Sequence, residues 1–266
     1  MLLSVKPLLR RLLGLEPRVT VPPLPQPDPP LCLIGDLHGR ADLLELMLAR
    51  IAAEARGAEA HLVFVGDLID RGPDSAGVLR LIHGLCQADP QRVTCLMGNH
   101  ERMLMDFLDA PAARAKRWLQ AGGVETLHSF GLSLRLPEGL APARHFADLA
   151  LSLRAALQPD LLPWLTGLPL YWQGEGLAVV HAAALPDMPM ASQPEAALLW
   201  GQSGSAAPRP DGLWLAHGHV IVPRVQITPG RIALDTGAYR SGRLSALWLD
   251  ARGHQVIEVE AAPASP

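Results

Sequence analysis

The chain has 266 residues, of which 23 are Lys or Arg and 26 are Asp or Glu, so its formal net charge is −3. That balance excludes the basic footprint of nonspecific nucleic-acid binding, and we expect no nucleic-acid partner. The length suits one large core in a single catalytic domain, and the three cysteines, Cys32, Cys86 and Cys95, indicate reduced packing residues of a cytoplasmic protein.

The first 30 residues differ in character from the rest of the chain. Residues 1–18 place seven leucines among basic side chains, which predicts a short basic amphipathic segment. Pro7 and the Arg10-Arg11 pair interrupt the apolar region that a signal peptide needs. The sequence contains no run of roughly 18 apolar residues, so it predicts no membrane-spanning helix. Residues 1–18 can make a weak membrane-surface contact, or they can dock on their own domain or fray. Residues 19–30 contain six prolines and predict a stiff, extended linker.

Three short aliphatic runs bounded by glycine predict buried strands of an α/β fold. They cover residues 31–34, 61–65 and 93–97. Between the first two runs, apolar residues recur at helical spacing from Leu43 to Ile51, and the second gap repeats this pattern. Residues 31–97 therefore predict two successive βαβ units.

Each of these strands is followed by glycine and then by side chains that bind hard metal ions. The segments are Gly35-Asp36-Leu37-His38-Gly39, Gly66-Asp67-Leu68-Ile69-Asp70-Arg71-Gly72 and Gly98-Asn99-His100-Glu101. Because ligands bind at the carboxyl ends of strands in an open α/β sheet, these side chains are expected to converge. Asp36 and His38 can share one cation. Asp67 can bridge two cations, and Asn99 can add a neutral oxygen to the second.

Two later histidines complete a candidate metal site. His181 follows the apolar run 177–180, and His219 follows the run 213–216 with Gly218 beside it. His217 competes with His219 for one ligand position, and the Gly-His pair favours His219. A mixed Asp, His and Asn set without thiolate suits Mn²⁺, Fe or Zn²⁺ better than a closed structural zinc site.

The region between the motifs and the later histidines has a different pattern. Residues 103–172 show helical periodicity with Pro and Gly breaks, which predicts a helical insertion that lines the site. Arg114, Lys116, Arg117 and Trp118 can contact substrate there, although a charged face beside one packed tryptophan explains them equally. Residues 177–259 read as short strands with Gly and Pro turns, which fits a second sheet.

On these motifs the sequence resembles the calcineurin-like metallophosphoesterases, and within them the bacterial branch of the phosphoprotein phosphatase (PPP) family of serine/threonine phosphatases. The resemblance runs from about Leu31 to Leu249 and includes Val180-His181-Ala182, Gly218-His219 and Asp235-Thr236-Gly237. It implies a two-sheet β-sandwich flanked by helices (α/β/β/α), with metals at the strand ends. Residues 31–260 then form the catalytic domain, and residues 261–266 form a tail.

The resemblance also implies roles for individual residues. Two divalent metal ions are expected, most simply Mn, with Fe or Zn as alternatives. Asp36 and His38 would hold the first metal, and Asp67 would bridge. The second metal would be held by Asn99, His181 and His219. A hydroxide activated by both metals would attack the phosphorus, so no phosphoenzyme is expected.

The remaining catalytic roles come from the same comparison. His100 matches the general acid that protonates the leaving oxygen, and Asp70 matches the carboxylate that orients it. Arg71 is expected to grip two phosphate oxygens through its planar fork. Asn99 can also donate a hydrogen bond from its amide nitrogen to the phosphate.

The sequence departs from the family pattern at two places. Ala182-Ala183 stands where the family usually has a glycine, and Gln202 stands where many relatives have a phosphate-binding arginine two positions after a tryptophan. Gln202 cannot supply that charge. Arg209 or Arg224 would then have to reach in from a neighbouring loop.

Three functions follow from this reading. The leading one is a metal-dependent serine/threonine-type protein phosphatase that acts on a phosphorylated protein or a small phosphoester. The alternative is a symmetrical dinucleoside tetraphosphate hydrolase, which would need a base-stacking aromatic. Candidates for that aromatic are Trp118, Trp164, Trp172 and Trp200. A noncatalytic scaffold is a third function, disfavoured because the proposed ligands and the acid pair are all present.

Overall fold

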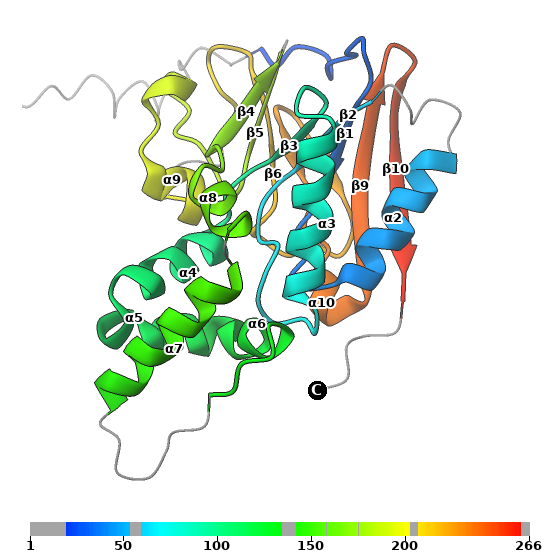
Figure 1. The fold of residues 1–266 in the computed structure, drawn as a ribbon. Helices are drawn as coiled ribbons and strands as arrows, with labels where there is room; N and C mark the ends of the chain where they lie inside the picture. Colours follow the sequence, from blue (N-terminus) through cyan, green and yellow to red (C-terminus); the bar gives the residue numbers. More distant parts are fainter. Residues whose placement is uncertain are drawn as a thin grey trace, which may run out of the picture.

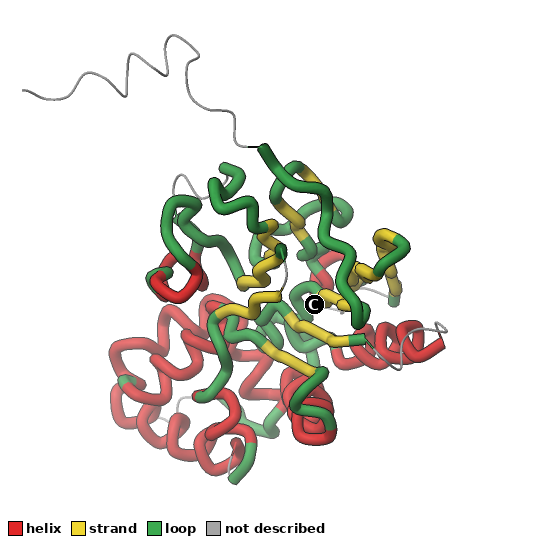
Figure 2. Tube along the Cα trace, turned by 90° about the horizontal axis from the view of Figure 1, so that it is seen from above, coloured by secondary structure: helices red, strands yellow, loops and turns green. Residues whose placement is uncertain are grey.

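The computed structural model describes residues 20–53, 60–134, 142–157, 159–174, 176–202 and 207–261. The predicted amphipathic segment, residues 1–18, and residues 262–266 of the predicted tail lie outside this part of the chain. Among the described residues, two five-stranded sheets are flanked by helices, as the α/β/β/α prediction requires (Figure 1). Seen from above, most of the helices lie on one side of the strands (Figure 2).

The first sheet carries the motif segments and has the strand order β10-β9-β1-β2-β3. The parallel strands are β1 (Leu31–Ile34), β2 (His61–Phe64) and β3 (Val93–Cys95), with Leu31 opposite His61. Two antiparallel strands, β9 (Arg243–Asp250) and β10 (Gly253–Glu260), extend this sheet beyond β1. The parallel pairs confirm the two predicted βαβ units.

The crossover helices α2 (Ala41–Ala53) and α3 (Ser75–Ala88) cover the outer face of the first sheet (Figure 1). Helix α2 buries Leu43, Leu44, Met47 and Ile51, which are the residues at helical spacing in the sequence. Asp74 begins α3 by accepting a hydrogen bond from the backbone of Gly77. These helices fix the carboxyl ends of β1 and β2 at one edge of the sheet.

The second sheet has the order β4-β5-β6-β8-β7. Its strands are β4 (Tyr171–Gly174), β5 (Leu177–Val180), β6 (Trp214–His217), β7 (Gln226–Thr228) and β8 (Arg231–Ala233). The prediction that residues 177–259 fit the second sheet is therefore wrong for β9 and β10, which belong to the first. Strand β9 is apolar on both faces, since Leu247 packs between the sheets and Trp248 packs toward the helices. Such a strand is suited to a central position, here beside β1.

The core has two main parts. Between the sheets, Leu33 and Val63 of the first sheet meet Val179 and Ala216 of the second. A larger cluster lies between the first sheet and the helices, and Phe64 belongs to it. The alternation of inward and outward side chains along each short strand produces both parts.

In the described part of the predicted insertion, helices follow one another as far as Thr166, and the insertion ends in β4. Its helices are α4 (Asn99–Asp109), α5 (Pro111–Trp118), the π-helical turn η2 (Leu119–Gly123), α6 (Val124–Ser129), α7 (Pro142–Leu157) and α8 (Leu161–Thr166). The remaining helices are η3 (Met190–Ser192), α9 (Glu195–Trp200) and α10 (Ala238–Ser241). Within the described ranges, no helix is both long and apolar enough to cross a bilayer.

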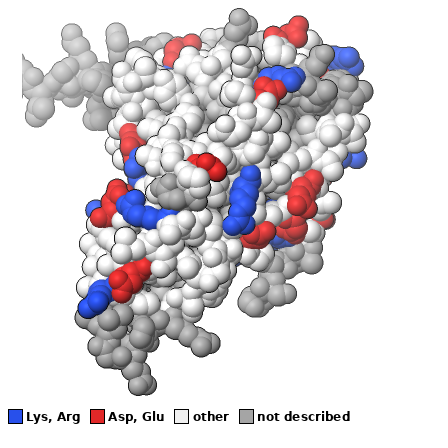
Figure 3. All heavy atoms as spheres, viewed as in Figure 1, with Lys and Arg blue, Asp and Glu red and all other residues white. Residues whose placement is uncertain are grey.

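The described part of the proline-rich segment, residues 20–30, has no helix or strand but packs on the sandwich. Val21 and Leu24 contact the core between the sheets, and the Trp214 indole donates a hydrogen bond to the Pro22 carbonyl at 3.0 Å. This part is therefore attached to the sandwich rather than free-standing, because its apolar side chains cover the sheet end. On the face shown in Figure 3, basic and acidic side chains are interspersed without a continuous basic surface.

Candidate metal centre and active site

The loops after the strands of both sheets hold their polar side chains in an unusual backbone conformation. Among the described residues, five that are not glycine have a positive φ. They are His38 (46°), Asp67 (49°), Asp70 (73°), Arg71 (70°) and His219 (63°). All five are candidate site residues from the sequence. Strained left-handed residues of this kind gather at functional sites, where the surrounding structure maintains them.

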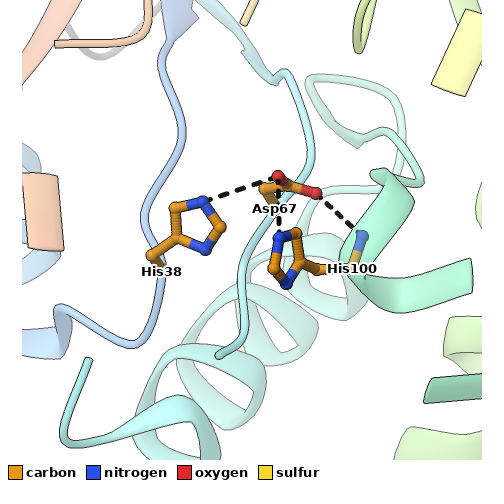
Figure 4. Close-up of side chains that lie close together, drawn as sticks. All are labelled: His38, Asp67 and His100. Atoms are coloured by element: carbon orange, nitrogen blue, oxygen red, sulfur yellow. Dashed lines mark hydrogen bonds and ion pairs between the residues drawn. The ribbon is translucent and has the colours of Figure 1, made fainter. Parts of the chain in front are cut away.

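Two groups of candidate ligands meet at Asp67. His38, Asp67 and His100 form the first, and Asp67, His181 and His219 form the second, with the ligand atoms of each group within 4.8 Å of one another. Figure 4 shows the first group, in which the imidazole rings of His38 and His100 face the Asp67 carboxylate. The Asp67 carboxylate lies 3.5 Å from His38 Nε2 and 3.3 Å from His181 Nε2. A carboxylate common to both groups occupies the position from which it can bridge two cations.

Hydrogen bonds to backbone carbonyls determine which ring nitrogen of His38 and His181 faces the Asp67 carboxylate. His38 Nδ1 donates to the Ile69 carbonyl at 2.9 Å, and His181 Nδ1 donates to the Val65 carbonyl at 3.0 Å. Both rings therefore present Nε2 to the Asp67 carboxylate, the arrangement typical of metal-binding histidines. Burial lowers the pKa of His38 to about 3, so its ring is neutral. Against burial, the Asp67 carboxylate raises the pKa of His181 to about 10, so a cation on Nε2 would replace a proton there.

Asn99 and His219 complete the second group. Asn99 Oδ1 lies 2.8 Å from both His181 Nε2 and His219 Nδ1. The structure therefore brings His219 into the group, whereas His217 Nδ1 donates to the carbonyl of Gly218 at 3.0 Å. Asn99 is the first residue of α4, which is how the loop after β3 delivers its side chain to this point.

Asp36 provides the test of whether these residues fit a metal. Its Oδ2 accepts a hydrogen bond from the His219 backbone at 3.0 Å, but its Oδ1 is buried and has no hydrogen-bond partner among the described residues. Burial and the nearby Asp235 carboxylate raise the pKa of Asp36 well above its usual range. A buried, unsatisfied carboxylate oxygen is costly unless it is paired with positive charge. The oxygen and nitrogen donors here fit a pair of divalent cations.

Gly218 is required beside this carboxylate for a steric reason. A Cβ atom at position 218 would lie 1.8 Å from Asp36 Oδ1. A side chain there would displace Asp36, which explains the Gly-His pair that the sequence analysis used to choose His219.

His100 and Asp70 form a buried pair beside the metal ligands. His100 Nδ1 donates to Asp70 Oδ2 at 2.7 Å, and the Asp70 carboxylate also accepts from Trp118 Nε1 and from Thr126 Oγ1 at 2.6 Å. Although burial opposes it, the carboxylates of Asp67 and Asp70 raise the pKa of His100. A histidine held protonated by a fixed carboxylate can act as a general acid. His100 also lies within reach of the first metal position, and its bond to Asp70 favours the acid role.

Arg71 lies at the same edge, next to an aromatic ring that the sequence analysis did not select. Its guanidinium carbon is 4.8 Å from the centroid of the Tyr239 ring, and Nη1 is 3.0 Å from His38 Nε2. The Tyr239 ring also contacts the His38 ring edge-on at 5.1 Å. Tyr239 thus supports the Arg71 guanidinium. Its position two residues after the Asp235-Thr236-Gly237 motif is the only signal in the sequence.

Glu101, the last residue of the third motif, has a structural role that the sequence did not predict. Its carboxylate is fully buried and accepts hydrogen bonds from the backbone nitrogens of Asp67, Leu68, Ile69 and Gly98 at 2.8 to 3.3 Å. It therefore ties the loop after β2 to the start of α4. The sequence gives no direct signal for the bonds from Asp67, Leu68 and Ile69, because these join residues more than 30 positions apart. The bond from Gly98 spans three positions.

We expect Glu101→Gln to destabilise the protein rather than to act on chemistry alone. The amide group retains one acceptor oxygen but turns its NH₂ toward backbone N–H groups, which costs about 3 kcal/mol and lowers the Tm by roughly 6–12 °C. Differential scanning calorimetry measures this directly. Glu45→Gln, an exposed substitution on α2, is the control and should leave the Tm unchanged. An unchanged Tm for Glu101→Gln would mean that the carboxylate does not hold the two segments together.

A cavity of about 420 Å³ adjoins the second group of ligands. His219 lines it together with Ala183, Trp200, His217 and Arg231. Trp200 and Gly201, the two residues before Gln202, line it, whereas Gln202 is not among its lining residues. Ala182 and Ala183, the two residues that replace the usual glycine, also form part of its wall.

The two arginines suggested as substitutes for that missing charge do not line this cavity. Arg209 is buried and donates to the carboxylate of Asp211 and to the carbonyls of Leu185 and Met188. Arg224 is exposed and is not among the lining residues. The hypothesis that Arg209 compensates for Gln202 is wrong, because its guanidinium is committed to a loop inside the fold.

The candidate tryptophans differ in whether they are buried or line the cavity, and basic residues of α5 lie at the surface. Trp118 is fully buried and stacks on Phe107, so it cannot receive a base. Trp200 is half-buried at the cavity wall, and the Arg117 guanidinium lies 4.3 Å from its ring centroid. Arg114 and Lys116 are exposed. Of the four aromatic candidates, Trp200 is the one that lines the cavity.

Comparisons with known proteins agree with this geometry. The family model described as "Calcineurin-like phosphoesterase" matches residues 29–223. A symmetrical bis(5'-nucleosyl)-tetraphosphatase of Dechloromonas aromatica is 29% identical over 86% of this chain and 95% of its own length. Serine/threonine-protein phosphatase 2 of Escherichia coli is 27% identical over 80% and 89%. A crystal structure provisionally named as a diadenosine tetraphosphatase has a TM-score of 0.59 at 23% identity and covers 91% of this chain and 97% of its own, a likeness that shows the fold.

Proposed function

Because the chain belongs to the calcineurin-like phosphoesterase family, whose members are metal-dependent hydrolases, we propose that it cleaves a phosphoanhydride bond of dinucleoside tetraphosphates. Two divalent cations, with Mn²⁺ as the expected pair, would be held by the two ligand groups that share Asp67. The full-length likeness to a symmetrical tetraphosphatase supports this substrate class. The leading expectation from sequence, a serine/threonine protein phosphatase, becomes the second candidate.

The side chains around the metal positions have separate tasks in such a hydrolysis. When bound, the cations supply positive charge to the phosphoryl group and lower the pKa of a water molecule. Arg71 binds phosphate oxygens through its planar guanidinium, which Tyr239 supports from below. The water oxygen bonds to the phosphorus and the water gives up a proton to solvent, the bridging P–O bond breaks, and His100 gives its proton to the departing oxygen. Asp70, fixed by Trp118 and Thr126, holds the His100 ring in place.

The cavity beside His219 is the observation that carries this proposal. It adjoins the second ligand group through His219, has a volume of about 420 Å³ and presents Trp200 at its wall. Pockets of this size accommodate small-molecule ligands. A phosphomonoester has only its leaving group beyond the attacked phosphorus, so it needs no second cavity of this kind. A dinucleoside tetraphosphate has a nucleotide on each side of the bond that breaks.

A specific observation keeps the protein phosphatase as a second candidate. Val220 and Ile221 follow His219 directly and are 56% and 42% exposed. An exposed apolar rim next to a phosphoryl site suits a peptide as well as a base. The full-length likeness to an E. coli serine/threonine phosphatase supports the same substrate class.

A parallel assay of the Mn²⁺-loaded enzyme separates the two functions. The substrates are diadenosine tetraphosphate, a phosphothreonine peptide and p-nitrophenyl phosphate. We expect kcat/KM to be about 100-fold higher for the tetraphosphate than for the peptide, with ADP as the only nucleotide product. A preference for the peptide would establish the second candidate. If no substrate is turned over with Mn²⁺, Fe²⁺ or Zn²⁺, the noncatalytic scaffold becomes the better reading.

A further inference from the structure

The outer face of the second sheet is apolar on one side and polar on the other. On β5 and β6, Val180 and Leu215 point outward and pack under Leu198 of α9. Farther along the sheet, the outward positions hold His217 on β6, Arg231 on β8, and Gln226 and Thr228 on β7. Residues that alternate with these along the strands, such as Ile232, point the other way into the core between the sheets. The sequence thus places a polar row on a sheet face that α9 covers only in part.

The uncovered part of this face is the floor of the cavity. Arg231, Gln226 and Thr228 lie on the sheet side, Trp200 at the end of α9 forms another wall, and His219 lines the cavity where it meets the second ligand group. Arg231 is half-buried, and burial lowers the pKa of its guanidinium below the usual range. A partly desolvated arginine next to polar side chains is well suited to an anionic group.

Contacts from the helical insertion position Trp200. Arg117 of α5 stacks on the indole at 4.3 Å, and Arg102 of α4 forms an ion pair of 2.8 Å with Glu195 at the start of α9. These two contacts join α9 to the insertion, so the orientation of the tryptophan ring is set by two elements. An aromatic ring fixed in this way provides a flat surface on which a base can stack.

We propose that this cavity is a nucleoside-phosphate subsite, in which Arg231 pairs with a phosphate and Trp200 stacks on the base. This inference rests on the proposed function and adds to it which half of the substrate the cavity holds. His100, the acid for the leaving oxygen, belongs to the first ligand group and does not line the cavity. The cavity instead adjoins His219 of the second group. It therefore receives the half that stays attached to the attacked phosphorus, and Arg231 pairs with a phosphate of that half other than the one under attack.

Steady-state kinetics of Arg231→Gln test the proposal on two substrates. We expect the KM for diadenosine tetraphosphate to rise at least about tenfold, with kcat and KM for p-nitrophenyl phosphate changed less than about twofold. Unchanged turnover of the small substrate also shows that the variant is folded. Arg231→Lys should restore part of the affinity. Arg224→Gln, an exposed arginine outside the cavity, is the matched control and should behave as wild type.

A binding measurement separates failure of this proposal from failure of the proposed function. ADP is titrated calorimetrically into the full chain in EDTA, so that neither turnover nor metal contributes. Wild type should bind ADP, and Arg231→Gln and Trp200→Leu should each weaken binding at least about tenfold. If wild type does not hydrolyse the tetraphosphate but shows this ADP result, the proposed function fails and the subsite stands. Absence of ADP binding to wild type, or equal binding by Arg231→Gln, would overturn the subsite. A raised KM for the phosphothreonine peptide alone would overturn it in favour of a peptide groove.

Discussion

Replacement of Asp67 by asparagine is expected to lower kcat at least about 10³-fold for every phosphoester substrate. Asp67 is shared by both candidate ligand groups, so this change removes negative charge from two cation positions at once. A loss of about 4 kcal/mol of charge stabilisation corresponds to that factor. The asparagine oxygen can still accept the hydrogen bond that the His100 backbone donates to Asp67 at 3.0 Å, so the fold is expected to persist.

Metal content is the second readout of the same variant. After loading with Mn²⁺ and dialysis, we expect about two ions per wild-type chain and one or none per Asp67→Asn chain. Asp148→Asn, an exposed carboxylate on α7, is the control and should match wild type in both measurements. Full metal content together with full activity in Asp67→Asn would remove the bridging role.

His100→Asn is expected to have the next largest effect, with a kcat loss of about 10²- to 10⁴-fold that depends on the leaving group. Since p-nitrophenolate can leave without a proton, that substrate should lose least. Phenyl phosphate and diadenosine tetraphosphate should lose more. Asp70→Asn should show the same ordering at smaller amplitude, because it leaves the imidazole in place without the carboxylate 2.7 Å from Nδ1.

The dependence on the leaving group distinguishes an acid from a ligand. The rings of His100 and His38 are 4.7 Å apart, so His100 lies close enough to the first ligand group to be mistaken for a member of it. Equal losses on all substrates, together with lower metal content, would assign it to metal binding. His128→Asn, an exposed histidine on α6, should leave the kinetics unchanged.

The convergence of the candidate residues could be predicted because its signals are local. A buried strand, a glycine and a polar side chain lie next to one another in sequence, and parallel strands bring their carboxyl ends to one edge. Asp36, Asp67 and Asn99 follow this rule, and the structure brings them together. The choice of His219 over His217 depended on Gly218, whose missing Cβ is what Asp36 requires.

What the sequence analysis missed depends on contacts between distant segments. The assignment of β9 to the first sheet follows from its pairing with β1, which joins residues more than 200 positions apart. Glu101 and Tyr239 act through loops and rings that only the folded chain brings near. The loss of charge at Gln202 was visible in the sequence, but the place of Arg231 in the cavity was not, because strand order determines that β8 faces the same cavity as α9.

Two cations are expected to share the Asp67 carboxylate. Anomalous diffraction from a crystal of the wild-type chain grown with Mn²⁺ tests this expectation most directly. We expect two anomalous peaks, one on each side of Asp67, the first near Asp36 and His38 and the second near Asn99, His181 and His219. A single peak away from Asp67, or no peak at saturating Mn²⁺, would contradict the account.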